Sequence, residues 1–102
     1  FAVTSAKRHP AAPDTPAMAE FLPGYEITSW GGICGPAGMP PAMVDKLSGL
    51  LKTALQSEAL KEAFDKQGAQ RIWLSPADTA KYRADNEARL APVIKASGAK
   101  VE

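Results

Sequence analysis

The sequence holds very few residues of the kinds that build redox and metal sites. Its 102 residues include one cysteine, Cys34, and one histidine, His9. A lone cysteine cannot close an internal disulfide or supply a multi-cysteine zinc site, and a lone histidine excludes reactions that need paired histidines. No acid pair, metal-ligand cluster or phosphate-binding loop stands out. We therefore expect no metal site and no cofactor.

An excess of one charge and a long apolar run are also missing. The chain has 12 Lys and Arg residues against 11 Asp and Glu residues, a net charge of +1. Nucleic-acid-binding domains normally carry a basic excess, so we expect no nucleic-acid partner. No stretch approaches the ~18 uninterrupted apolar residues of a membrane span. With 45% hydrophobic and 23% charged residues, the composition is that of a folded globular chain, either one small domain or part of a larger one.

The N-terminal quarter predicts a strand, a loop and a short helix. Residues 1–5 are apolar and suited to a β-strand. Three prolines follow in residues 9–16, which indicates an extended loop because proline lacks an amide donor. A short helix is expected over residues 16–21, started by Pro16. Because the chain begins at Phe1, inside an apolar run, we expect it to be a section of a longer protein.

The strongest strand prediction covers residues 25–34, which are rich in β-branched and aromatic types. A further short strand is expected over residues 70–74. Helical periodicity predicts a helix over residues 41–56, a second helix beginning near Ser57, and a third that Ser75 caps and that runs to Gly98. These elements predict an α/β fold with short strands and three main helices.

Four residues are candidate ligand contacts. Thr4 and Ser5 end the first predicted strand, where hydroxyls and backbone amides suit a carboxylate; ordinary turn chemistry is the favoured alternative. Trp30 fits either the wall of a ligand cleft or, more often, a core or interface position. Gly31 indicates a bulge or a close approach by a ligand.

Catalysis has little support in the sequence. Cys34 has no base placed to activate it, so an inert thiol is favoured over a nucleophile. His9 lies in the proline-rich loop and is interpreted as a solvated residue. We therefore expect that the chain is not an enzyme.

Three segments, taken together and in order, resemble one known family. They are residues 2–8 with 13–20 (AVTSAKR, PDTPAMAE), residues 23–30 leading into 35–40 (PGYEITSW, GPAGMP), and residues 91–98 (APVIKASG). In this order and spacing they closely resemble the C-terminal part of the Bug family, the TctC-like solute receptors of tripartite tricarboxylate transporters. The resemblance covers essentially the whole chain.

The resemblance implies the C-terminal portion of a type II periplasmic binding-protein fold. Residues 1–24 would lie near the hinge between two lobes, and residues 25–102 would complete one lobe, so that the chain is a single incomplete domain. Either residues 1–5 or residues 25–34 could be the strand that crosses between the lobes. The intact periplasmic receptor would capture a small carboxylate and deliver it to a membrane permease. An alternative is an interaction module that binds no solute and self-associates, for example as a homodimer, through its open edge and apolar faces.

Overall fold

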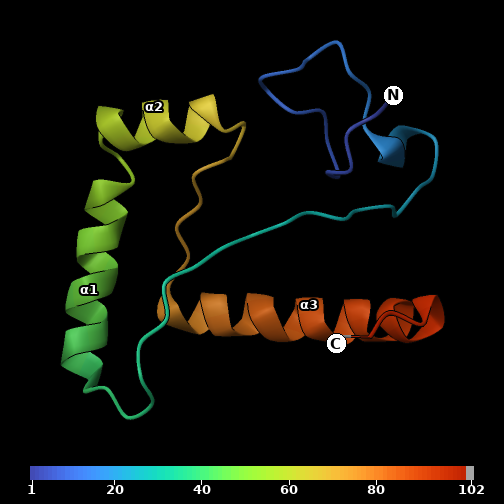
Figure 1. The fold of residues 1–102 in the computed structure, drawn as a ribbon. Helices are drawn as coiled ribbons and strands as arrows, with labels where there is room; N and C mark the ends of the chain where they lie inside the picture. The colour runs from blue at the N-terminus through green and yellow to red at the C-terminus, as the bar shows by residue number, and fades with distance from the viewer. Residues whose placement is uncertain (101–102) are drawn as a thin grey trace.

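The computed structural model describes residues 1–100 and consists mainly of helices and extended chain (Figure 1). A single 3-10 turn, η1, covers Met18–Glu20. Three α-helices follow: α1 at Pro41–Ala54, α2 at Glu58–Lys66 and α3 at Pro76–Ser97. Helix α2 lies across the end of α1, while α3 lies below them in this view, in contact with α1, and ends near the C-terminus (Figure 1).

The helices begin and end where local sequence signals predict. The Ser57 hydroxyl accepts the Leu60 amide at 3.4 Å at the start of α2, and the Ser75 hydroxyl accepts the Asp78 amide at 3.1 Å at the start of α3. Helix α3 ends at Gly98, whose φ of 69° lies in the left-handed region that favours glycine. Two helix predictions were slightly too long: α1 stops two residues before Gln56, and the helix expected over residues 16–21 is only η1.

The predicted α/β fold is wrong. Among residues 1–100 the structure contains three helices and no strand, and only one isolated parallel bridge, between Val3 and Ala17. The segments expected as strands, residues 1–5, 25–34 and 70–74, lie outside any sheet. The described chain is therefore all-helical with long extended connections.

The physical reason for this error is that a strand depends on a partner. β-propensity reports how well a side chain fits a pleated, half-buried surface rather than a fixed preference of the backbone. Residues 25–36 and 69–75 run without a turn or bend, as such side chains favour. No other described segment lies alongside to form a ladder of hydrogen bonds with them. Instead, residues 70–74 lie beside α1 and residues 25–34 lie beside α3.

Residues 70–74 are attached to α1 by side chains. The Trp73 indole nitrogen donates to the Ser48 carbonyl at 3.1 Å, and the Lys52 ammonium lies 4.5 Å from the centre of the Trp73 ring. Arg71 donates to the Leu55 carbonyl at 2.6 Å, just beyond the C-terminus of α1. A cation there also complements the negative end of the helix dipole.

Residues 25–34 are attached to α3 in a similar way. The Trp30 and Tyr82 rings meet edge to face, with centroids 5.5 Å apart and planes at 80°. Seven residues further along α3, Arg89 donates to the Glu26 carbonyl at 2.6 Å. These two contacts hold the extended segment along the helix.

Very little of the chain is buried. Ala17, at 1% exposure, is the one buried hydrophobic residue among residues 1–100. The accessible surface is 8484 Å², whereas a compact monomer of this mass exposes roughly 5,500 Å². The radius of gyration is 16.6 Å, against about 13 Å for a compact chain of this length. The apolar stripe of α1, expected to be core, is consequently half-exposed at Met43, Leu47 and Leu50.

Because so little is buried, helix caps should matter strongly. Replacing Ser75 with alanine removes the acceptor for the Asp78 amide, and we expect a loss of about 1 kcal/mol in the free energy of unfolding. Threonine at the same position should restore most of this loss, because its hydroxyl can accept the Asp78 amide and donate to the Asp78 carboxylate as that of Ser75 does. Urea unfolding followed by circular dichroism at 222 nm measures the change.

Ser97→Ala is the matched control, because the Ser97 hydroxyl donates to the Ile94 carbonyl in the last turn of the same helix and caps no N-terminus. We expect this change to cost less than about 0.5 kcal/mol. Equal losses from the two alanine variants would contradict a capping role for Ser75.

Candidate functional site

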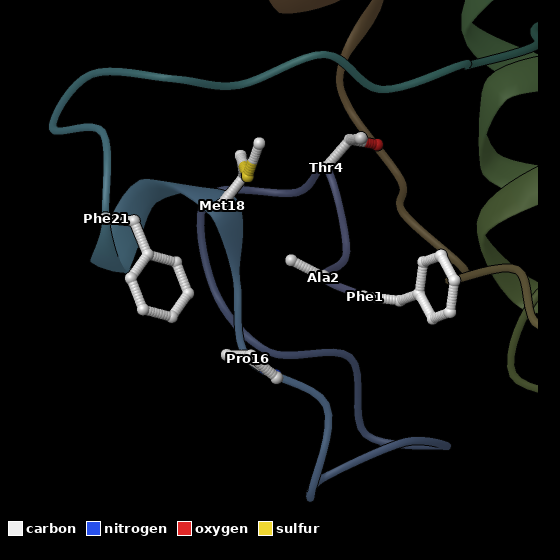
Figure 2. Close-up of a pocket in the computed structure, with 6 residues that line it drawn as sticks. All are labelled: Phe1, Ala2, Thr4, Pro16, Met18 and Phe21. Carbon is white, nitrogen blue, oxygen red and sulfur yellow. The ribbon is translucent and has the colours of Figure 1, made fainter.

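An open hollow lies at the N-terminal end of the molecule. It has a volume of about 460 Å³ and is lined by Phe1, Ala2, Thr4, Pro16, Met18 and Phe21. The Phe1 and Phe21 rings stand on opposite sides of it, and the Thr4 hydroxyl points away from the other lining residues (Figure 2). The lining is mostly hydrocarbon, so the hollow suits the carbon skeleton of a small molecule better than a charged group.

The hollow exists because two short segments meet there. The Val3 amide donates to the Pro16 carbonyl at 2.9 Å, and the Met18 amide donates to the Val3 carbonyl at 2.9 Å. This pairing is the isolated bridge, and it buries Ala17 between the two segments. The proline-rich loop between them is thereby closed into a ring.

An ion pair closes the same ring. Arg8 binds Glu20 with two parallel hydrogen bonds, Nε to Oε1 at 2.8 Å and Nη2 to Oε2 at 2.9 Å. Arg8 also donates to the Pro13 carbonyl at 3.2 Å, and Glu20 accepts the Ala17 amide at 2.9 Å. The paired geometry is the most specific form of arginine–carboxylate contact.

The ion pair changes the acidity of its carboxylate. The hydrogen bond from Arg8, and after it the hydrogen bond from the Ala17 amide, lowers the pKa of Glu20 from 4.5 to about 2. Because the folded pKa is depressed, this contact stabilises the loop fully above pH 4.5. Its contribution is lost as the pH falls toward 2.

Thr4 and Ser5, two of the predicted contact residues, lie in this N-terminal loop. Thr4 lines the hollow, and its carbonyl accepts the Ile27 amide at 2.9 Å. The Ser5 hydroxyl donates to the Lys7 carbonyl at 2.8 Å, which is the turn chemistry weighed as the alternative. The structure thus places only Thr4 of this pair at the hollow.

The other two predicted contact residues lie elsewhere. Trp30 packs against Tyr82 of α3 and is 44% exposed. Gly31 follows it, and a Cβ atom built there would meet no atom within 4 Å. The structure therefore does not bring Trp30 and Gly31 together with Thr4 at the hollow. Their role in binding stays a prediction.

The apolar lining of the hollow was not predicted from the sequence. Its other lining residues are spread over the first segment and the stretch around η1: Phe1, Ala2, Pro16, Met18 and Phe21. The signal that could have found them is the pair Arg8 and Glu20, twelve positions apart with opposite charges on either side of a proline-rich loop. Such a pair indicates a closed loop, and a closed loop brings the first segment against η1.

A second crevice lies between the proline-rich loop and the end of α2. It has a volume of about 650 Å³ and is lined by residues 9–11 and by residues 65 and 68–71. The His9 Nδ1 accepts the Ala11 amide at 3.1 Å, and its Nε2 is buried with no partner. His9 is thus packed rather than solvated as expected. No group of three metal-ligating side chains occurs among residues 1–100.

Removing Arg8 should restore ordinary acidity to Glu20. In Arg8→Ala we expect the pKa of Glu20 to rise from about 2 most of the way to 4.5, because the largest stabiliser of the carboxylate is gone. The pH titration of the Glu20 side-chain carboxyl signal by NMR measures this value directly.

Arg83→Ala is the control, since Arg83 pairs with Glu87 on α3 and should leave Glu20 unchanged. A Glu20 pKa that stays near 2 without Arg8 would show that another group holds this carboxylate. A pKa already near 4.5 in the unaltered chain would show that the ion pair does not form.

Comparisons with known proteins agree on one family. A model described as the tripartite tricarboxylate transporter family receptor matches residues 1–99. Protein BugT of Bordetella pertussis is 34% identical over the whole chain, which spans 32% of its length. A UPF0065 protein from the tcbD-tcbE intergenic region of Pseudomonas sp. (strain P51) is 37% identical over 72% of the chain, or 23% of its own length. No solved structure matches.

The family model covers almost all of the chain, and it agrees with the resemblance in residues 2–8, 23–30 and 91–98. No helix of residues 1–100 is both long and apolar enough to cross a membrane. The chain spans about a third or less of the curated relatives it matches. The chain belongs to the tripartite tricarboxylate transporter receptor family.

Proposed function

We propose that this chain is the C-terminal section of a periplasmic receptor that captures a small organic carboxylate for a tripartite tricarboxylate transporter. The observation that carries the proposal is the family match over residues 1–99. The role is capture and delivery to a membrane permease rather than catalysis. The relatives are about three times as long as the chain, so most of the solute site would lie on residues outside it.

The contribution of this chain to binding would come first from the hollow. Phe1 and Phe21 face it from two sides and would contact the carbon skeleton of the solute. The Thr4 hydroxyl is the polar side-chain group of its lining, and no hydrogen bond occupies it within residues 1–100. A change of its χ1 rotamer, a rotation of about 120°, would turn it to donate to a carboxylate oxygen in the hollow.

Ser5 is the weaker donor of the predicted pair. A hydroxyl has one hydrogen to donate, and that of Ser5 goes to the Lys7 carbonyl. A carboxylate needs donors, so Ser5 could serve it only after breaking this turn. Trp30 and Gly31 would form a second contact surface. The solute, or another part of the receptor, would have to extend from the hollow to these two residues to touch it.

A hybrid receptor tests the proposal. Residues 1–102 replace the matching third of BugT from Bordetella pertussis, and thermal shift identifies which mono-, di- or tricarboxylate stabilises the hybrid. In the Thr4→Val hybrid we expect about tenfold weaker binding of that solute by calorimetry, because one hydrogen bond to a charged group is lost.

Thr53→Val is the matched control, because the Thr53 hydroxyl donates to the Gly49 carbonyl within α1 at 3.2 Å, away from the hollow. It should leave affinity unchanged. A folded hybrid that binds no carboxylate, while BugT does, would contradict the proposed function. Equal affinity of the Thr4→Val hybrid and its parent would remove Thr4 from the site but leave the function standing.

A further inference from the structure

The ion pair between Arg8 and Glu20 lies beside the hollow without lining it. Neither residue is among those that line the hollow, yet each is attached to one of its two walls. The first wall, residues 1–4, ends four residues before Arg8, and the second wall, residues 16–21, contains Glu20. Figure 2 shows side chains of both walls around the hollow. The ion pair therefore connects the two walls from outside the hollow.

The backbone alone attaches the two walls to each other at one place. The Val3 amide donates to the Pro16 carbonyl, and the Val3 carbonyl accepts the Met18 amide. Both hydrogen bonds involve Val3, so walls held only there could pivot about this residue. Arg8 lies five residues beyond Val3, and Glu20 lies two residues beyond Met18. The ion pair is thus a second attachment, and it fixes the angle between the walls.

The geometry of the ion pair makes it more than an ordinary surface contact. The side chains of Arg8 and Glu20 are 49% and 41% exposed, and exposed ion pairs in general contribute little to stability. Paired arginine–carboxylate hydrogen bonds are the exception, because they define one relative orientation. Further hydrogen bonds hold each partner here, from Arg8 to the Pro13 carbonyl and to Glu20 from the Ala17 amide. The pair therefore has a defined place relative to both walls.

We propose that Arg8 and Glu20 are positioning residues for solute binding. They hold η1 against the first wall so that Met18 and Phe21 stay opposite Thr4, and they do not themselves contact the solute. The inference rests on the proposed function, since it concerns the same solute site. All the contacts that carry it lie within residues 1–21.

A different role for Arg8 would be to bind the carboxylate of the solute directly. The contacts of its side chain disfavour this role. All three guanidinium nitrogens already donate, Nε and Nη2 to Glu20 and Nη1 to the Pro13 carbonyl. The two roles predict opposite effects when the Glu20 charge is removed. A directly binding Arg8 would be released toward the solute, whereas a positioning pair would be broken.

Neutral substitutions of each partner test the proposal in the hybrid receptor described above. We expect both Arg8→Ala and Glu20→Gln to weaken binding of the carboxylate about fivefold, the size typical of changes that act through neighbouring residues. Arg8→Lys should also weaken binding, because lysine keeps the charge but lacks the planar fork. Calorimetry measures the Kd of each variant, and circular dichroism checks that each is folded.

The pH profile separates positioning from a general loss of stability. In Arg8→Ala the Glu20 pKa should return from about 2 most of the way to 4.5. The ratio of the Kd of Arg8→Ala to that of the unaltered hybrid should therefore rise further as the pH falls from about 7 to about 4, because protonation weakens the remaining contact with the Ala17 amide. This ratio cancels the titration of the solute. Glu20→Gln should give a flat ratio, since glutamine does not titrate.

Arg83→Ala is the matched control, because Arg83 pairs with Glu87 on α3 at 3.6 Å. It should leave the Kd unchanged. Tighter binding by Glu20→Gln would show that Arg8 binds the solute directly and would overturn the proposal. Unchanged affinity in Arg8→Ala, in a hybrid that binds its carboxylate and is weakened by Thr4→Val, would overturn it while leaving the receptor function standing. A hybrid that binds no carboxylate would contradict the receptor function and this inference together.

Discussion

The organisation of this chain follows from one constraint: each extended segment is held by side chains and lacks a neighbouring strand. Trp73 and Arg71 fasten one segment to α1, and Trp30 with Arg89 fastens the other through α3. Side-chain attachment fixes a segment at a few points and leaves its amides and carbonyls to water. The large exposed surface and the near absence of buried residues are consequences of this arrangement.

The lack of a neighbouring strand also explains why the helix predictions were largely correct and the strand predictions were wrong. The helix start at Ser75 was predictable because a cap, a proline and an acid act within four residues of one another, and the start at Ser57 because the capping serine is followed by an acid. Residues 25–34 have the composition of a strand, yet a strand forms only with a partner strand, which can lie anywhere in the protein or outside it. A sequence pattern shows that a segment is suited to a strand, but it does not show whether a neighbouring strand is present.

At the candidate site, too, local features were predictable from the sequence, whereas contacts between distant segments were not. Thr4 was predictable as a hydroxyl at the end of an apolar segment, and the structure places it at the hollow. The apolar lining was not, because Phe1 and Phe21 meet only after the proline-rich loop closes. That closure depends on Arg8 and Glu20, which no local motif connects. The family itself was identifiable because it rests on the order and spacing of short segments rather than on their pairing.

The paired hydrogen bonds between Arg8 and Glu20 have a mechanical consequence. They make residues 8–20 a self-contained ring that keeps its shape without a core around it. Apart from the turn at residues 22–25, one backbone hydrogen bond, from the Ile27 amide to the Thr4 carbonyl, joins this end of the chain to the rest. Residues 9–11 of the ring also face residues 65 and 68–71 at the end of α2 across the second crevice, so the ring has a neighbour on this side as well. Two lining residues of the hollow, Pro16 and Met18, belong to the ring, so the position of the ring against the first segment sets the shape of the hollow.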